Sequence, residues 1–321
     1  MWTLEIQNLT THYKTLRGYV KAVDNVSFHV DEGEALGLAG ESGCGKTTVA
    51  LSILKILPPG GIILGGKILL GDMNIVELDE YYMREKVRWK KVAIIFQGAM
   101  NALNPVYKIG DQIAEAILTH EQETDKAQAL ERARKLFELV GIEPSRVDNF
   151  PHEFSGGMRQ RAMIAMALAC NPELLIADEP GTALDVIVQA QVLKLMKDLR
   201  EKFNLSMIMI THDLSIIADT CEKVAIMYAG KLVEYGDAVT IFKEPLHPYT
   251  QGLMGAFPDI NAPKTRMVSI PGLLPDMLDP PGGCRFHPRC KYSMDICRRE
   301  EPASLDVGNE HDIACHMIQK T

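Results

Sequence analysis

This sequence lacks any uninterrupted apolar run of about 18 residues, the length that a membrane-spanning helix needs. Its first residues also lack the basic and then apolar order of a secretory signal peptide. We therefore expect a chain without a membrane span. Any association with a membrane is expected to go through a partner.

Positive charge is also scarce, since 34 Lys and Arg stand against 42 Asp and Glu and give a formal net charge of −8. Proteins whose main ligand is nucleic acid usually carry basic excess, so we expect no nucleic-acid partner. Apolar residues are plentiful, at 46% of 321 residues. This length and composition suit one large domain with an appendage, or two domains.

Residues 40–48 read GESGCGKTT and fit the phosphate-binding pattern G-x-x-x-x-G-K-[ST]. The apolar residues 34–39 before them predict a buried strand, and residues 49–57 after them predict a helix that Pro58 ends. Glycines let backbone N–H groups turn toward phosphate oxygens, Lys46 adds positive charge, and the Thr47 hydroxyl suits Mg²⁺. The expected nucleotide-binding residues are Gly40, Glu41, Ser42, Gly43, Cys44, Gly45, Lys46, Thr47 and Thr48.

Alternating patterns at residues 4–9 and 23–30 predict two half-exposed strands, which form an antiparallel front to an otherwise α/β chain. Tyr13 and Tyr19 are expected in a polar loop between these strands. Stacking of a base on an aromatic ring is worth roughly 1–3 kcal/mol, and Tyr19 is our candidate for that contact with adenine. The alternative for each tyrosine is a surface or packing role.

Two apolar runs end in polar side chains. Residues 92–96 lead to Gln97, which suits metal ligation, water orientation or a loop hydrogen bond. Residues 174–177 lead to Asp178 and Glu179. Because neighbouring side chains on a strand point in opposite directions, we assign Asp178 to the Mg²⁺ shell and Glu179 to a general base that activates water. The alternative is a pair of solvated acids at a strand end.

Helical patterns fill residues 111–141, with one apolar face in the run from Thr124 and a helix-ending Gly141. No strand pattern interrupts them, so we expect a helical insert. A serine and two glycines then begin the next apolar helix. They predict a helix cap with exposed N–H groups, which is a second anion site or an ordinary capped helix. These residues are Ser155, Gly156 and Gly157.

The last part of the α/β pattern contains a helix capped by Asp185 and a buried strand at residues 207–210. His212 follows that strand, where its side chain is placed to donate to a γ-phosphate oxygen; a structural role is the alternative. Residues 224–227 predict another strand, with a turn at Ala229 and Gly230.

In this order, the motifs resemble those of the nucleotide-binding subunit of an ATP-binding cassette (ABC) transporter. The matching parts are Walker A at 40–47, Q-loop Gln97, signature at 155–161, Walker B at 178–179, D-loop at 183–185 and switch His212. The resemblance implies a P-loop NTPase cassette with a mixed-sheet core, an antiparallel β front and a helical insert.

The same resemblance implies ATP and Mg²⁺ as ligands, held between the Walker A of one cassette and the signature of its partner. Met158 and Gly181 depart from the family pattern, which has Gln and Thr or Ser there, but Glu179 and His212 remain. We therefore expect hydrolysis. The expected catalytic residues are Lys46, Gln97, Glu179 and His212, and the expected Mg²⁺ ligands are Thr47, Gln97 and Asp178.

Near the C-terminus, the runs HPYT at 247–250, IPG at 270–272 and GCRFHPRC at 283–290 look like the tail of oligopeptide/dipeptide importer ATPases. This resemblance implies ATP-driven peptide uptake from the cytoplasmic face of the membrane. The implied partners are a second ATPase subunit (identical or different), two transmembrane permease subunits and, indirectly, an extracytoplasmic solute-binding protein. The insert from Asn101 to Gly141 is the expected permease-docking surface, with Gln97 linking it to the nucleotide.

Three alternatives stay open: the same role in a nickel or oligosaccharide importer, a soluble non-transport ABC ATPase, and a non-enzymatic ATP-switched module. The expected domains are a nucleotide-binding domain at 1–245, with its insert at about 98–160, and a C-terminal domain at 246–321. The latter is rich in Pro and Gly and poor in periodic apolar runs, so we expect it to be small and irregular.

Four of the seven cysteines lie in that C-terminal domain, spaced C-x5-C-x6-C-x17-C. Zinc sites usually contain close C-x2–4-C pairs, which are missing here, whereas looser spacing suits an iron–sulfur cluster. The tail is also similar to that of dipeptide-importer ATPases thought to carry a 4Fe–4S cluster. We therefore expect such a cluster as a structural staple, with zinc or free thiols as alternatives. Its ligands would be Cys284, Cys290, Cys297 and Cys315.

Overall fold

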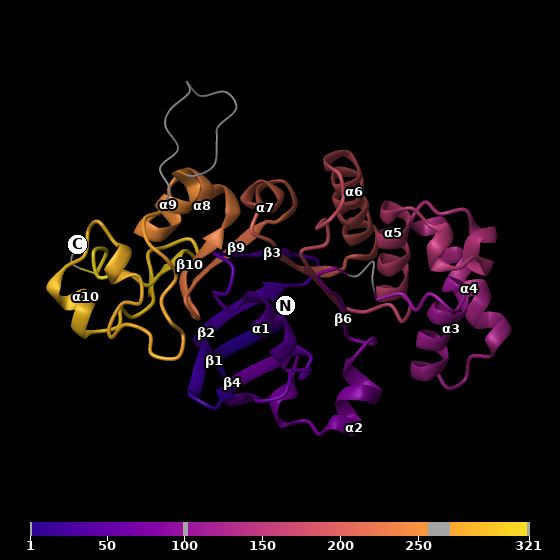
Figure 1. Cartoon of the computed structure of the whole chain (residues 1–321), viewed down its shortest axis with the longest axis horizontal. Helices are drawn as coiled ribbons and strands as arrows, with labels where there is room; N and C mark the ends of the chain where they lie inside the picture. The colour runs from indigo at the N-terminus through magenta and orange to yellow at the C-terminus, as the bar shows by residue number, and fades with distance from the viewer. Residues whose placement is uncertain (1, 99–101, 256–269, 320–321) are drawn as a thin grey trace. The chain divides into compact units, whose positions relative to one another are not determined.

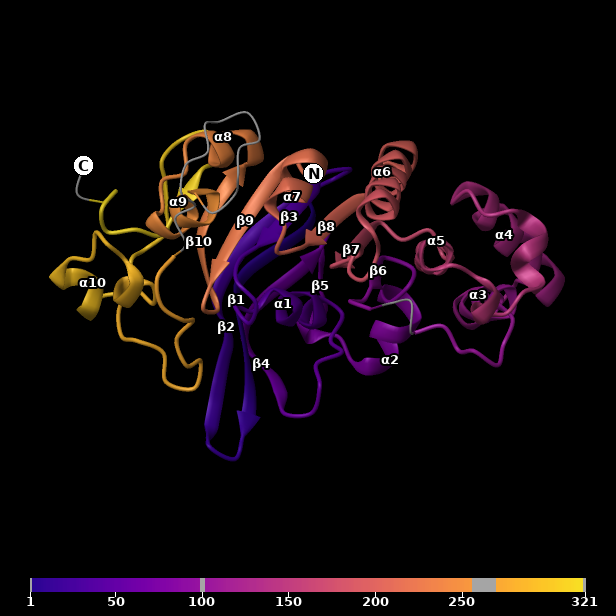
Figure 2. The same cartoon turned by 45° about the horizontal axis from the view of Figure 1, so that its top comes forward.

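The computed structural model describes residues 2–98, 102–255 and 270–319, and Figures 1 and 2 show the chain as a ribbon. The chain divides into two compact units. Unit 1 comprises Asp31–Gly33 and Glu77–Ile208, and unit 2 comprises Trp2–Val30, Glu34–Val76 and Met209–Thr321. Within the described ranges, no helix combines the length and the apolar character that a membrane crossing requires.

Unit 2 contains an antiparallel sheet with strand order β2-β1-β4-β5 and a run of neighbouring strands in the order β11-β12-β10-β9-β3. In the second group, β3 and β9 are parallel, whereas β10 is antiparallel to both β9 and β12. The antiparallel front and the mixture of strand directions are thus observed as predicted. The strands are β1 (Trp2–Thr15), β2 (Gly18–Asp31), β3 (Ala35–Ala39), β4 (Gly61–Leu70), β5 (Met73–Asn74), β9 (Lys223–Tyr228), β10 (Lys231–Asp237), β11 (Leu305–Asp306) and β12 (Asp312–Ile313).

The predicted polar loop around Tyr13 and Tyr19 is wrong. Tyr13 lies in β1 and Tyr19 lies in β2, so these two strands are joined by a very short turn. β1 continues this far because it pairs with β4 up to Tyr13, which stands opposite Gly61. Threonine and tyrosine favour strands, and this pairing outweighs the polar character of the segment.

All five residues of β3 are buried, as expected for a parallel strand with both faces covered. Helix α1 (Lys46–Ile53) follows it and lies beside β1 in Figures 1 and 2. The helix begins earlier than predicted and ends before Pro58. It ends there because Lys55 has a φ of 50°, a left-handed conformation that does not continue an α-helix.

Unit 1 contains the parallel strands β6 (Val92–Ile95) and β7 (Leu174–Asp178) and the helices from α2 to α6. Between residues 102 and 154 the chain is helical with no strand, so the predicted helical insert is observed; Asn101 lies outside the described residues. Gly141 follows α4 with a φ of 71°, as predicted, and Asp125 caps the start of that helix. The elements are α2 (Glu80–Tyr82), the π-helical turn η2 (Met83–Val87), α3 (Ile109–His120), α4 (Lys126–Leu139), the 3₁₀ turns η4 (Pro144–Asp148) and η5 (Pro151–Glu153), α5 (Gly156–Ala167) and α6 (Val186–Phe203); β8 (Ser206–Ile210) continues from unit 1 into unit 2.

The C-terminal segment, meaning residues 246–255 and 270–319, belongs to unit 2 and is anchored on β10. Glu234 of β10 is 1% exposed, and its carboxylate accepts hydrogen bonds from the backbone N–H groups of Leu246 and His247. It also contacts His311 Nε2 at 2.8 Å. These bonds and the pairing of β12 with β10 hold a segment with little regular structure of its own. Unit 2 also contains the 3₁₀ turn η1 (Ile75–Glu77, at its boundary with unit 1), α7 (Leu214–Thr220) and α8 (Ala238–Lys243); the segment's helices are α9 (Pro248–Gly255), η6 (His287–Arg289) and α10 (Asp295–Arg299).

Candidate nucleotide-binding site

The phosphate loop of unit 2 has a backbone that requires glycine at two positions. Gly40 has a φ of 143°, and a Cβ placed there would lie 2.1 Å from the carbonyl oxygen of Met227. Gly45 has a φ of 112°, and its Cβ would lie 2.2 Å from the carbonyl oxygen of Ala22. Side chains are excluded by backbone atoms at both positions. The loop is therefore a narrow turn between β3 and α1 whose backbone can approach a ligand closely.

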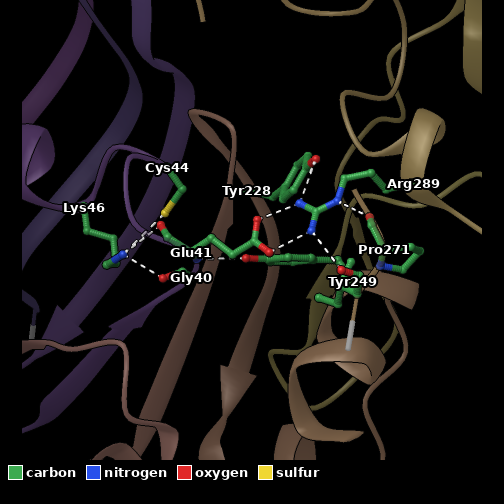
Figure 3. A network of polar contacts seen from close by, with 9 residues as sticks. Gly40, Glu41, Cys44, Lys46, Tyr228, Tyr249, Pro271 and Arg289 are labelled. Carbon is green, nitrogen blue, oxygen red and sulfur yellow. Dashed lines mark hydrogen bonds and ion pairs between the residues drawn. The ribbon is translucent and has the colours of Figure 1, made fainter. Parts of the chain in front are cut away.

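Lys46 is 7% exposed and folds back over this loop (Figure 3). Its Nζ donates to the carbonyl oxygens of Gly40 and Glu41 at 2.7 and 3.1 Å and lies 3.6 Å from Cys44 Sγ. Burial raises the pKa of the Cys44 thiol, with the Lys46 charge opposing that shift. The loop's own carbonyl groups therefore hold the ammonium group at the phosphate-binding turn.

The other expected contacts of this loop differ in exposure. Ser42, Gly43 and Thr47 are exposed, whereas Thr48 is buried. The Thr48 hydroxyl lies 3.3 Å from the hydroxyl of Tyr13, so the tyrosine that contacts the phosphate-loop helix is Tyr13. Tyr19 is 45% exposed on β2. Its stacking on adenine stays a prediction, and so does the γ-phosphate contact of His212, an exposed side chain after β8.

The two acids that follow the strand pattern in unit 1 have different surroundings. Asp178 ends β7 and is 2% exposed. Glu179 has left the strand, with a φ of 48°, a strained conformation for a non-glycine residue. Its Oε2 accepts hydrogen bonds from Gln97 Nε2 at 2.7 Å and from the Thr182 hydroxyl at 3.0 Å. The structure thus joins the predicted base to the predicted Q-loop glutamine.

The capped helix of the second predicted anion site lies within unit 1, and its binding of an anion stays a prediction. Ser155 caps α5, and its hydroxyl accepts a hydrogen bond from the backbone N–H of Met158 at 3.3 Å. Gly156 and Gly157 form the first turn of the helix, where N–H groups lack helical partners. A Cβ on Gly157 would lie 2.5 Å from Val188 Cγ1, so this turn packs closely against the start of α6.

Sequence reasoning missed two residues that contact the phosphate loop. Figure 3 shows that the Arg289 guanidinium pairs with the Glu41 carboxylate and that the Glu41 N–H points to the Tyr249 hydroxyl. Both partners come from the C-terminal segment. The sequence contained one signal for them, the acid Glu41. An acid is unexpected in a loop that binds anions, and it predicts a basic side chain nearby.

The prediction of a 4Fe–4S cluster is wrong. All seven cysteines are free thiols, and the four C-terminal ones lie around one small cavity. Within the described residues, however, no three or more His, Cys, Asp or Glu side chains are arranged to hold a metal ion, and the zinc alternative fails on the same ground. Burial raises the pKa of Cys284 to about 12 and also raises those of Cys290 and Cys315, which favours the protonated thiol over the thiolate that metals require.

Known proteins match this chain over nearly its whole length. The family model described as "ABC transporter" matches residues 23–182, and the one described as "Oligopeptide/dipeptide transporter, C-terminal region" matches residues 233–297. The probable peptide ABC transporter ATP-binding protein y4tR of Sinorhizobium fredii is 46% identical over 97% of this chain and 94% of its own length. The oligopeptide transport ATP-binding protein OppD of Bacillus subtilis is 47% identical over 98% of this chain and 88% of its own.

A solved structure agrees with these matches. The ATP-binding cassette MJ0796, described as a dimer in a post-hydrolysis state with ADP and Pi bound, superposes with a TM-score of 0.64. It is 25% identical and covers 73% of this chain and 98% of its own. The phosphate loop, the capped signature helix and the acids at the end of β7 agree with these matches. The chain therefore belongs to the ABC transporter ATP-binding proteins, in the group that carries the oligopeptide/dipeptide transporter C-terminal region.

Proposed function

We propose that this chain is the ATP-hydrolysing subunit that powers uptake of di- or oligopeptides through a separate membrane permease. The observation that supports this most is that one chain carries, in order, the ABC transporter region at 23–182 and the oligopeptide/dipeptide region at 233–297. The relatives that cover nearly the whole chain are named as peptide transport proteins. The nickel, oligosaccharide and soluble alternatives have no such support.

The phosphates of ATP are assigned to the loop at residues 40–48. A Cβ would fill the space beside Gly40 and Gly45, so the loop is a backbone cradle of the kind that binds phosphate oxygens. Lys46 neutralises phosphate charge, and Thr47, which is exposed, is the proposed hydroxyl ligand of Mg²⁺. Glu41, Ser42, Gly43, Cys44 and Thr48 complete the proposed contacts, and Tyr19 is the proposed adenine partner.

Unit 1 contributes the proposed chemistry. Asp178, with Thr47 and Gln97, has the oxygen donors that Mg²⁺ prefers, and the bound ion would neutralise charge on the triphosphate. Glu179 is the proposed general base for the attacking water. Its hydrogen bonds with Gln97 and Thr182 orient its carboxylate. A change in the hydrogen bond between Gln97 and Glu179 on nucleotide binding would transmit the nucleotide state to the rest of unit 1. In unit 2, His212 is the proposed donor to the γ-phosphate.

A second cassette, identical or different, is the proposed partner of the signature residues Ser155, Gly156 and Gly157. Val186 and Ile187 support this, because they begin α6 beside the signature turn and are 81% and 72% exposed. Exposed apolar side chains at such a position suit burial against another protein. The dimeric state of MJ0796 is consistent with this pairing.

Two permease subunits are the proposed membrane partners, with a solute-binding protein on the other side, so the chain would lie at the cytoplasmic face. Val106 and Tyr107 support docking at the helical insert, since they are 70% and 58% exposed. Tyr107 also lines a hollow along α3 that includes Asp111 and Leu118. The proposed domains are residues 1–245, with the insert at about 98–160, and residues 246–321.

Replacing Glu179 tests the chemistry. Glu179→Gln keeps the size and hydrogen-bonding capacity of the side chain but removes the base. We expect phosphate release to fall about 10²–10⁴-fold while ATP still binds and traps a closed dimer. Phosphate release and size-exclusion chromatography with ATP measure both. Near-normal turnover in this variant would reject Glu179 as the base.

Solute uptake tests the cargo. Cells whose own copy of the gene is deleted are supplied with the wild-type chain or with the Lys46→Ala variant. We expect the wild-type chain to restore uptake of labelled di- or oligopeptides and the variant to restore none. Restoration of nickel or oligosaccharide uptake, with peptide uptake unchanged, would replace the peptide assignment.

A further inference from the structure

A buried arginine of the C-terminal segment makes a double ion pair with the phosphate loop (Figure 3). Arg289 Nη1 donates to Glu41 Oε2 at 2.6 Å, and Nη2 donates to Glu41 Oε1 at 2.8 Å. The Arg289 side chain is 6% exposed and that of Glu41 is 29% exposed. Paired guanidinium–carboxylate hydrogen bonds are strong and directional. The pair therefore determines where the Glu41 side chain points.

Arg289 is itself held in place by further contacts, and one of them is the donation of its Nη2 to the carbonyl oxygen of Ile270 at 3.4 Å. Its Nε donates to the carbonyl oxygen of Pro271 at 2.8 Å, and its Nη1 lies 3.4 Å from the Tyr228 hydroxyl. The guanidinium carbon is 5.6 Å from the centre of the Tyr228 ring, a cation–π distance. The hydrogen bonds with Glu41 keep the pKa of Arg289 above its ordinary value, so its charge is permanent.

The C-terminal segment contacts the phosphate loop at two more points. The Tyr249 hydroxyl accepts a hydrogen bond from the backbone N–H of Glu41 at 2.9 Å, and Tyr249 is fully buried. Leu274 lies 3.6 Å from the position of a Cβ on Gly43. Contacts at positions 41 and 43 place the segment directly against the loop, so Arg289 is part of a wider interface.

A carboxylate in this loop is a liability unless it is paired. Phosphate groups are anions, and an unpaired acid beside them repels them. The Glu41 carbonyl oxygen accepts a hydrogen bond from Lys46, so the residue that carries this carboxylate is already in contact with the ammonium group that phosphates need. Arg289 removes both problems, because it cancels the negative charge and turns the carboxylate toward the C-terminal segment.

We propose that Arg289 is a positioning residue of the nucleotide site, which holds Glu41 away from Lys46 and neutralises it so that the loop accepts a triphosphate. This inference rests on the proposed ATP binding at residues 40–48. The C-terminal segment then affects the affinity of the loop for the nucleotide. Arg289 acts through Glu41 and needs no contact with the nucleotide.

Equilibrium binding of ATP, ADP and AMP to the purified full-length chain tests the proposal. The variants are Arg289→Ala, Glu41→Gln, the double variant and, as a matched control, Arg299→Ala, which removes an exposed arginine of the same segment. We expect Arg289→Ala to weaken ATP binding about tenfold, with a smaller effect on ADP and least on AMP. The control is expected to stay within about threefold of wild type. Glu41→Gln gives the effect of losing the acid alone and is the reference for the double variant.

The double variant separates positioning from simple support of the fold. If Arg289 acts by neutralising Glu41, Arg289→Ala has little further effect once the acid is gone, and the double variant binds ATP within about threefold of Glu41→Gln. In turnover assays, Arg289→Ala then raises the KM for ATP more than it lowers kcat. Equal losses in the single and double variants, or a fall in kcat with KM unchanged, would overturn the proposal.

Two further outcomes are decisive. If Arg289→Ala does not fold, the double variant and Arg289→Lys are tested for folding and ATP affinity in its place. Recovery in both variants supports the proposal, and loss in both refutes it. If the wild-type chain binds ATP and Arg289→Ala binds it equally well, Arg289 has no positioning role. Wild-type protein that binds no nucleotide would instead contradict the proposed function.

Discussion

The phosphate loop and the C-terminal segment lie against each other in unit 2, but different physical constraints hold them. The loop takes its shape from missing side chains, because backbone carbonyl groups occupy the space where Cβ atoms of Gly40 and Gly45 would be. The C-terminal segment takes its place from buried polar side chains, with Glu234 and Arg289 as its two main anchors. We therefore expect added side-chain atoms to disrupt the loop, and we expect the loss of a buried polar side chain to destabilise the C-terminal segment.

The largest effect on stability is expected from Glu234→Ala. This change leaves the N–H groups of Leu246 and His247 and the His311 ring without their buried acceptor. Losses of this kind cost about 3–5 kcal/mol of unfolding free energy. Thermal or denaturant unfolding measures it, with Glu244→Ala, an exposed acid nearby, as the control. Equal stability of the two variants would remove Glu234 as an anchor.

Gly45→Ala is the corresponding test of the loop. The added Cβ would lie 2.2 Å from the Ala22 carbonyl oxygen, and the alanine would also have to adopt a φ of 112°. Strain of this kind costs about 1–3 kcal/mol, and we expect it to appear mainly as weaker ATP binding. Gly71→Ala is the matched control, since Gly71 also has a positive φ but its Cβ would meet no atom within 4 Å. Similar ATP affinities in the two variants would contradict the close-approach argument.

The smallest effect at neutral pH is expected from His247, whose contribution appears only as the pH is lowered. Complete burial lowers its pKa from 6.5 to about 3, and its Nδ1 accepts a hydrogen bond from the Tyr249 N–H. The unfolded chain therefore binds a proton below pH 6.5 that the folded chain refuses until about pH 3. Stability should fall as the pH is lowered through this window, by about 1.4 kcal/mol per pH unit.

His247→Asn removes this titration and leaves a side-chain acceptor near the same place. We expect the unfolding midpoint of the variant to depend less steeply on pH between 6 and 4 than that of the wild-type chain. His152→Asn, at an exposed position of unit 1, is the control and should keep the wild-type slope. Parallel slopes for all three proteins would mean that His247 does not titrate as its burial indicates.

Much of the fold follows from local patterns in the sequence. The continuous apolar runs became β3, β6 and β7, and Ser155 and Asp185 cap helices as predicted. The hairpin that contains Tyr13 and Tyr19 did not follow, because its length depends on pairing with β4, which is distant in sequence. Local alternation carries no information about a partner strand.

The candidate site divides in the same way. Motif residues such as Lys46, Asp178 and Glu179 were found because their spacing is fixed by a strand and the turn after it. Arg289 was missed because nearly 250 residues separate it from Glu41, and only folding brings the two charges together. The cysteine spacing gave a wrong answer for a related reason. Spacing shows that thiols can approach one another, but not that they are arranged to hold a metal ion, nor that burial raises the pKa of Cys284.

Phosphate release from Mg-ATP by the purified full-length chain, compared with its Lys46→Ala variant, tests the central claim most directly. The account predicts saturable release by the wild-type chain with its partner subunit present, and a rate about 10²–10³-fold lower in the variant, because the charge at the phosphates is lost. Release by the wild-type chain that does not exceed the variant's rate at saturating ATP would contradict it.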